Sequence, residues 1–314
     1  MIAGLLDSLV QHGSLYAISA LGIALSLRVL NWPDLTVDGS FTLGGAISAT
    51  LLVGGVGPVT AIVTAFAAGA MAGTATFGLH RKLGISKILS GILIMMVLYS
   101  INLRIMGGAN VSLLQTETVF SPLELLENGD PVRLLSYLAI GFVTLAAVVY
   151  LLLTRLGLFI RATGDNEFMV LGLGINTDGP LLIGMAFSNA LVAVSGALVA
   201  QNQGFADVSM GTGLILIGLA SLIIGEVVLS GGPTIAKHFS GKSLSRLQLF
   251  PWRSIAECVA AVLGAFIYFA IVALCLEIGL QATDLKLATG LLVIAGIAVR
   301  WQGPVIETYT RGKL

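Results

Sequence analysis

The sequence contains little charge. Only 10% of its 314 residues are Asp, Glu, Lys or Arg, whereas a soluble domain carries about 25%. Hydrophobic residues make up 56% of the chain, and the mean hydropathy is +0.99. Such a chain cannot hide its apolar surface from water, which excludes an ordinary soluble protein. Sixteen basic residues balance sixteen acidic ones, and this neutral total gives no support for nucleic-acid binding.

Cysteine and histidine are also scarce. The two cysteines, Cys258 and Cys275, lie within one apolar run, which excludes a disulfide framework. The three histidines, His12, His80 and His238, are too scattered to form a metal site. No nucleophile–base pair and no cluster of His, Asp and Glu stands within an apolar run. A membrane-embedded enzyme is therefore the least favoured function.

Long apolar runs are abundant by contrast. The run from Leu134 to Leu153 contains no charged residue and has about the ~20 residues that a helix needs to cross a bilayer. Nine such runs predict an all-α, polytopic membrane helix bundle of about 8 to 10 spans. The first run lacks the features of a cleaved signal peptide and is expected to be retained, and the second is rich in glycine and is expected to be short, re-entrant or discontinuous. The expected spans are 9–30, 39–55, 58–79, 84–105, 134–153, 179–202, 210–230, 254–277 and 285–300.

The basic residues predict the orientation of the bundle. Lys and Arg resist translocation and collect on the cytoplasmic side. With the N-terminus outside, the C-terminus and a basic loop at about 231–253 fall inside, and the loop at about 106–132, with four acidic residues and no basic one, falls outside. The acidic residues are Glu117, Glu124, Glu127 and Asp130. Thirteen of the sixteen basic residues then lie inside: Arg28, Arg81, Lys82, Lys87, Arg155, Arg161, Lys237, Lys242, Arg246, Arg253, Arg300, Arg311 and Lys313.

Two segments share a pattern that suggests an inverted repeat. Residues 35–55 and 205–225 each contain an acidic residue, then a serine, then an apolar run with several glycines. In the predicted topology the first starts inside and the second outside, as an inverted repeat requires. Helix composition alone also produces such a likeness by chance, so both explanations stay open. Other glycines, such as Gly69 and Gly73, are expected to let helix backbones approach closely.

The segment at about 157–178 is amphipathic and lies in the predicted cytoplasmic loop between the fifth and sixth spans. A short helix along the membrane face can dock into a groove on a soluble partner. The alternative is an ordinary loop helix that rests on the bundle, and the residues alone favour neither. Its apolar side chains include Phe159, Ile160, Met169, Val170 and Leu171, and its polar ones include Arg161, Asp165, Asn166 and Glu167.

Several motifs resemble one family of transporters. The stretches 161–166 (RATGDN) and 171–176 (LGLGIN) resemble the cytoplasmic coupling segment of the permeases that serve ribose and branched-chain amino acid ABC importers. The stretches 14–17 (SLYA) and 20–22 (ALG) resemble the first span of that family. Three more stretches resemble a branch of this family to which tryptophan and tyrosine uptake systems are assigned. They are 35–41 (LTVDGSF), 223–226 (IIGE) and 284–287 (DLKL). Residues 236–253 fit the family poorly.

The resemblance implies a single permease domain over residues 1–314, in the cell inner membrane, that pairs with a second copy of itself as a homodimer. It also implies two ATPase subunits below and a periplasmic or lipid-anchored substrate-binding protein above. The chain itself would bind no cofactor and contain no catalytic residue, since the partner ATPase uses the ATP and magnesium. The residues implied in coupling to the ATPase are Arg161, Thr163, Gly164, Asp165, Asn166 and Glu167.

The stretch Ser240–Ser243 (SGKS) resembles the end of a phosphate-binding loop, G-x-x-x-x-G-K-[ST]. The first glycine of that motif would fall on Ala236, and the loop between the flanking spans is too short for a nucleotide site. We therefore expect a basic cytoplasmic loop here rather than an ATP site.

Polar residues within predicted spans are candidates for the translocation path, because burying them in lipid is costly. Glu226 is close enough to the inner boundary to pair with a basic loop residue, which favours an ion pair. Gln201, Asn202 and Gln203 lie at the outer end of their span, where they could contact the substrate or the binding protein. The candidates are Asp38, Ser40, Asn102, Asn189, Gln201, Asn202, Gln203 and Glu226.

Three functions remain open. The leading one is a permease that passes a small solute, preferably an amino acid, while partner subunits hydrolyse ATP. The second is a self-sufficient secondary transporter, which the repeat favours and the scarcity of ionisable groups within the spans disfavours. The third is a non-transporting membrane scaffold, which leaves the polar residues within the spans unexplained.

Overall fold

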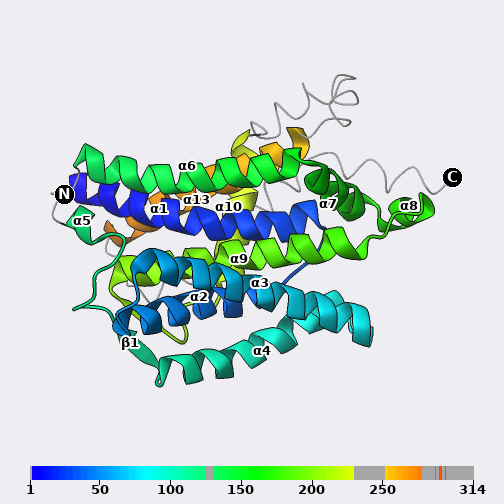
Figure 1. The fold of residues 1–314 in the computed structure, drawn as a ribbon. Helices are drawn as coiled ribbons and strands as arrows, with labels where there is room; N and C mark the ends of the chain where they lie inside the picture. The colour runs from blue at the N-terminus through cyan, green and yellow to red at the C-terminus, as the bar shows by residue number, and fades with distance from the viewer. Residues whose placement is uncertain are drawn as a thin grey trace.

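A computed structural model describes residues 2–124, 130–229 and 252–277, with residues 287, 290, 291 and 294 in addition. These residues form a bundle of long helices that run side by side, with α6 and α4 on opposite sides of it (Figure 1). The elements are α1 (Ile2–Ala24), the π-helical turn η1 (Leu25–Val29), α2 (Thr36–Val53), α3 (Pro58–Leu83), α4 (Lys87–Met106), β1 (Asn110–Ser112), α5 (Ser121–Glu124), α6 (Pro131–Leu153), α7 (Arg155–Asp165), α8 (Glu167–Gly172), α9 (Asp178–Gln203), β2 (Phe205–Asp207), α10 (Leu214–Leu229) and α13 (Trp252–Glu277).

Seven of these helices are long and apolar enough to cross a membrane, and α10 is a shorter apolar helix. The prediction of an all-α, polytopic membrane protein is therefore confirmed. The first eight predicted spans correspond to α1 with η1, α2, α3, α4, α6, α9, α10 and α13. The ninth, 285–300, lies outside the described residues except for the four isolated positions. The 231–253 loop, with its Ser240–Ser243 motif, lies outside them except for residues 252 and 253.

Local sequence signals explain where several helices begin and end. At the start of α6, Pro131 follows Asp130, and the Asp130 carboxylate accepts a hydrogen bond from the backbone N–H of Val132 at 2.8 Å. Ser86 caps α4 in the same way, because its hydroxyl accepts from the N–H of Leu89 at 3.3 Å. At the other end of helices α3 and α9, Gly84 and Gly204 adopt the left-handed conformation that glycine tolerates best.

Helix α9 occupies the centre of the bundle, where it packs against α1, α2 and α3. Small residues allow these close contacts: a Cβ atom on Gly44 of α2 would overlap with the backbone of Ala193, and one on Gly196 would overlap with that of Phe41. Gly69 and Gly73 of α3 face α9 in the same way, which confirms the packing role predicted for them. The outer helices α4 and α6 expose most of their apolar side chains, as lipid-facing helices do.

The second span is continuous rather than re-entrant, contrary to the expectation from its glycines. The three glycines inside it, Gly39, Gly44 and Gly45, face neighbouring segments, and α2 is an unbroken helix from Thr36 to Val53. The interrupted span is instead the seventh, because residues 208–213 lie between β2 and α10 without helical structure. Gly211 on this stretch is so close to α2 that a Cβ atom would overlap with the carbonyl of Asp38.

The two segments of the proposed inverted repeat differ in local structure. Asp38 lies in the first turn of α2, whereas its counterpart Asp207 lies in β2, before α10 begins at Leu214. The segments therefore do not match residue by residue.

Several basic residues gather at one end of the bundle. Arg81, Lys82 and Arg161 lie at the end formed by the close of α3 and by α7, which we call the basic end. At the opposite end, β1 pairs with β2 in antiparallel register, with Asn110 opposite Asp207 (Figure 1). The loop predicted to be external, 106–132, lies at this opposite end in its described part.

Candidate functional site

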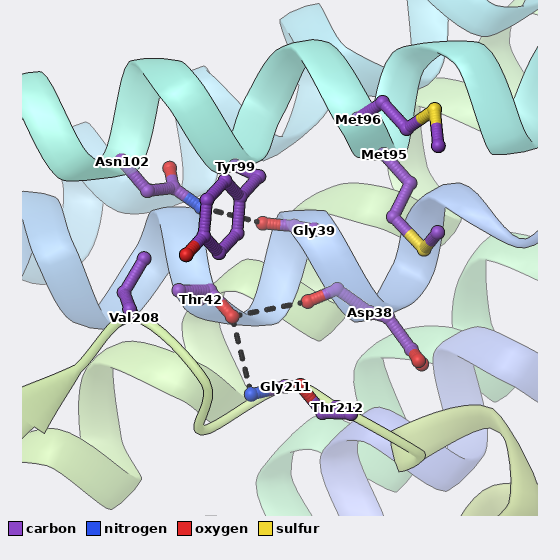
Figure 2. Close-up of a pocket in the computed structure, with 10 residues that line it drawn as sticks. All are labelled: Asp38, Gly39, Thr42, Met95, Met96, Tyr99, Asn102, Val208, Gly211 and Thr212. Atoms are coloured by element: carbon purple, nitrogen blue, oxygen red, sulfur yellow. Dashed lines mark hydrogen bonds between the residues drawn. The ribbon is translucent and has the colours of Figure 1, made fainter.

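A cavity of about 540 Å³ lies between α2, α4 and the non-helical stretch before α10 (Figure 2). Its walls are mainly apolar, and the Tyr99 ring lies over its middle in Figure 2. The lining residues are Asp38, Gly39, Thr42, Met95, Met96, Tyr99, Asn102, Val208, Gly211 and Thr212.

Two helices begin beside this cavity, inside the bundle rather than at its surface. The first turn of α2 is capped by Asp34, whose carboxylate accepts from the N–H of Thr36 at 2.9 Å. The start of α10 is capped by Asp38, whose two oxygens accept from the N–H groups of Gly213 and Ile215, each at 2.9 Å. Each carboxylate offsets the positive end of a helix dipole where water is scarce. Interrupted helices of this kind line substrate sites in many transporters.

The Asp38 side chain turns toward α10 and away from Tyr99 and Asn102 (Figure 2). Asn102 donates to the carbonyl of Gly39 at 3.3 Å, while its own side-chain oxygen is buried with no partner among the described residues. Thr42 connects the two walls, because its hydroxyl accepts from the N–H of Gly211 at 3.1 Å. The polar side chains of α2 at the cavity, Asp38 and Thr42, are therefore held in hydrogen bonds, whereas the Asn102 oxygen on α4 has no partner among the described residues.

A second polar cluster lies behind the cavity, on the other side of α2. Asn189, near the middle of α9, donates to the Asp34 carboxylate at 2.7 Å and accepts from the Ser40 hydroxyl at 2.7 Å. The hydroxyls of Thr36 and Thr76 also hydrogen-bond to each other at 2.7 Å. All five side chains are buried. This cluster attaches the start of α2 to α9 and α3.

The remaining path candidates lie near the two ends of the bundle. Glu226 forms an ion pair as predicted, although its partner is Arg28 of η1 rather than a loop residue, and two N–O distances are 2.8 Å. At the opposite end of the bundle, Gln201 accepts a hydrogen bond from the N–H of Val119 at 3.0 Å and donates one to the Ser48 hydroxyl at 2.9 Å. Asn202 accepts from the Tyr137 hydroxyl at 2.5 Å, and Gln203 donates to the carbonyl of Phe205 at 2.8 Å.

The structure thus brings Asp38 and Asn102 together at the cavity and Ser40 and Asn189 together behind it. Asp34 and Tyr99 were not among the predicted residues. A weak signal for Asp34 was present, because aspartate is common just before a helix, although Leu35 rather than Asp34 occupies the N-cap position of α2. No signal marked Tyr99, which is 55% exposed and is one of many aromatic residues in apolar runs.

The predicted coupling segment folds as two short helices, α7 and α8, at the basic end (Figure 1). Asn166 separates them and caps α8 by accepting from the N–H of Met169 at 3.0 Å. Thr163 is buried, and a Cβ atom on Gly164 would overlap with the carbonyl oxygen of Val29 in η1. Helix α7 therefore rests directly on the end of the first span.

Ion pairs attach α8 to the long helices. Arg81 of α3 lies 3.4 Å from the Glu167 carboxylate and 2.6 Å from that of Asp178 at the start of α9. Thr177 also donates to Glu167 at 3.2 Å. Burial lowers the pKa of Arg161, and the Asp165 carboxylate acts in the opposite direction.

The outer side of α8 is apolar. Phe168 is 86% exposed, and Met169, Leu171 and Leu173 are exposed beside it. Such side chains at a basic rim can enter a groove on a soluble partner. Among the described residues, no three His, Cys, Asp or Glu side chains gather as a possible metal site.

Comparison with known proteins relates the chain to transport permeases. The family model for the branched-chain amino acid transport system permease component matches residues 5–298. The tyrosine transport system permease protein of Clostridioides difficile is 37% identical over 291 residues, which cover 93% of this chain and 90% of that protein. An uncharacterized protein of Rickettsia prowazekii is 33% identical over 278 residues, 88% of this chain and 91% of that protein. The ribose import permease protein of Escherichia coli K12 is 28% identical over 232 residues, 72% of this chain and 70% of that protein.

No solved structure matches the chain. The family match covers nearly the whole sequence, and the long apolar helices are those that a membrane permease needs. Two of these three relatives are named as transport permeases. The chain therefore belongs to the family of branched-chain amino acid transport system permease components and is a multi-pass membrane protein.

Proposed function

We propose that this chain is the membrane-spanning permease of an ATP-binding-cassette importer. It passes a small solute, received from a substrate-binding protein, while separate ATPase subunits hydrolyse ATP with magnesium. It works as a homodimer in the cell inner membrane, with both its C-terminus and its basic end in the cytoplasm. The family match supports the permease role, and the helix pair α7–α8 is the observation that favours ATP-driven transport.

The α7–α8 pair is the proposed docking site for the ATPase. It presents exposed apolar side chains, with Phe168 the most exposed, next to charged Arg161, Asp165 and Glu167. A push on α7 would reach η1 through the Gly164 contact with Val29, and a push on α8 would reach α3 and α9 through Arg81. The docking pair therefore has two contacts with the long helices.

The contact between α7 and η1 is connected to the cavity through the start of α2. Residues 30–35 connect η1 to α2, and Asp34 in this connector caps α2 and binds Asn189. Asp38 then connects α2 to the start of α10. A movement of the docking pair can therefore change the walls of the cavity, which is what alternating access requires.

An amino acid is the proposed substrate class. One relative is a tyrosine transport permease and another a ribose import permease, so the names of the relatives do not decide between an amino acid and a sugar. A sugar carries hydroxyls in every direction and needs a polar lining. The walls of this cavity include Met95, Met96, Tyr99 and Val208, which suit an apolar side chain better.

The test is reconstitution and co-purification. Uptake into proteoliposomes should require the ATPase, ATP and the binding protein. Transport by the purified chain alone, driven by an ion gradient, would contradict the proposal and favour a secondary transporter.

Charge reversal tests the docking site. Arg161→Glu with Asp165→Lys should strongly reduce the amount of ATPase subunit that co-purifies with the tagged chain. The matched control is Arg253→Glu with Glu257→Lys, which reverses another pair four residues apart, on α13, and should leave recovery unchanged. Equal recovery from both double variants would count against the docking role.

A further inference from the structure

The end of the first span is wound more loosely than an α-helix. In the turn η1 the N–H of Leu30 donates to the carbonyl of Leu25, five residues back, at 3.0 Å. The N–H of Trp32 donates to the carbonyl of Ser26 at 2.8 Å, which closes a still wider ring. Among the described elements η1 is the only π-helical turn. Such turns are rare and occur frequently at functional sites.

Two strained features follow directly after this turn. Asn31 has a φ of +49°, and in the described part of the chain it is the only residue other than glycine with a positive φ. This left-handed conformation is unfavourable for an L-residue with a side chain. Trp32 is fully buried, and its indole N–H has no hydrogen-bond partner among the described residues. Backbone strain and an unsatisfied buried donor thus lie side by side, a combination that is typical of switch regions.

Contacts from three other helices hold the turn in this conformation. Arg28 forms its ion pair with Glu226 of α10 at 2.8 Å. The side chain of Leu30 packs so closely on Gly184 of α9 that a Cβ atom there would lie 2.8 Å from it. Gly164 of α7 lies against the last carbonyl of η1, and α7 meets the end of α1 at the basic end of the bundle (Figure 1). A movement of α7 therefore acts on η1 directly.

The residues beyond η1 are held by weaker contacts. The Lys87 ammonium lies 4.8 Å from the centre of the Trp32 ring, and the His80 ring meets the same ring edge-on at 4.7 Å. The Lys87 ammonium is also 3.5 Å from the carbonyl oxygen of Asn31, at the limit of a hydrogen bond. Such contacts can re-form after a small rotation. Asp34, which caps α2, follows two residues after Trp32.

We propose that η1 is a conformational switch that rewinds between this π-helical turn and an α-helical turn when the docked ATPase moves α7. Rewinding by one residue rotates the chain beyond it by about 100° and shifts it by about 1.5 Å. The change relieves the strain at Asn31, weakens the ion pair between Arg28 and Glu226, and carries the start of α2 with it. This inference rests on the proposed importer function and adds the element that converts a movement of α7 into a movement of α2.

Hydrogen exchange tests the switch directly. The permease–ATPase complex in proteoliposomes is compared with ADP and during ATP turnover. Peptides that cover residues 25–32 should exchange at least about fivefold faster during turnover, because rewinding breaks the bonds of the Leu30 and Trp32 N–H groups. Peptides from the middle of α9 are the control and should not change. Equal exchange of residues 25–32 in both states would overturn the switch, while ATP-driven uptake by the same proteoliposomes would leave the importer function standing.

Two substitutions at Asn31 separate a switch from a fixed turn. The Asn31 side chain is exposed and makes no hydrogen bond with a described residue, so both substitutions act through the backbone. Glycine adopts the left-handed conformation without strain and disfavours a helix, whereas alanine has the opposite preferences.

For a switch, Asn31→Gly should therefore reduce ATP-driven uptake about two- to fivefold while its melting temperature is unchanged or higher. Asn31→Ala should keep more uptake than Asn31→Gly despite a lower melting temperature. A fixed turn predicts the reverse order, because alanine strains it and glycine does not. The reverse order, or equal uptake by two variants that recover the same amount of ATPase, would overturn the proposal.

Discussion

Replacing Gly164 by alanine is expected to displace the docking helix α7 from the first span. The added Cβ atom would overlap with the Val29 carbonyl and lie 2.9 Å from the Cα atom of Leu30, where an ordinary contact begins at 3.4 Å. Both neighbours are backbone atoms, which cannot rotate away, so α7 must move away from η1. Overpacking of this kind costs about 1–3 kcal/mol.

The displaced helix should bind its ATPase more weakly. If the whole cost appears in docking, the affinity falls by about 5- to 150-fold. The assay compares Gly164→Ala with Gly78→Ala, a helical position of α3 where an added Cβ atom meets nothing within 4 Å. Both variants are purified through a tag, and the melting temperature, the co-purifying ATPase and the ATP-dependent uptake are measured. Equal values for the two variants would refute the close contact between α7 and η1.

Three further substitutions test the interior of the bundle. Gly44→Ala should lower the free energy of unfolding by about 1–3 kcal/mol, because the α2–α9 crossing has no room for a Cβ atom, while Gly78→Ala should not, as thermal unfolding in detergent will show. Glu226→Gln should lower the free energy of unfolding by about 1–3 kcal/mol, because it removes the charge that pairs with Arg28 at the end of the first span. The double variant Arg28→Glu with Glu226→Arg, which swaps the two charges, should restore stability in the same thermal unfolding assay. Asn189→Leu should destabilise more than Ser40→Ala, since it removes hydrogen bonds to two buried groups rather than one, and equal melting temperatures would contradict this order.

The spans could be predicted from the sequence because lipid imposes a simple rule on it. A run such as Leu134–Leu153 has no other stable place, and α6 occupies almost the same residues. The helix break in the seventh span could not be predicted, because it depends on a contact between Gly211 and α2 that is remote in the sequence. The glycine content instead pointed to the second run as the interrupted span, although the glycines inside α2 serve helix packing.

The candidate site was predictable only in part. Asp38 and Asn102 stood out because polar groups within apolar runs are rare, and both line the cavity. Their hydrogen-bond partners are remote in the sequence, so the sequence could not show that Asp38 caps α10 or that Asn102 binds the carbonyl of Gly39. Tyr99 was missed because a partly polar aromatic side chain in a membrane helix carries no distinct signal.

The capping of α10 by Asp38 has a consequence for how the protein is made. The carboxylate and the N–H groups that it binds are separated by 175 and 177 residues. At a synthesis rate of about 5–20 residues per second, the aspartate leaves the ribosome roughly 10 to 35 seconds before its partners do. During that interval the side chain lacks these partners in the bundle, so we expect α2 to reach its final depth only after residue 215 has been translated.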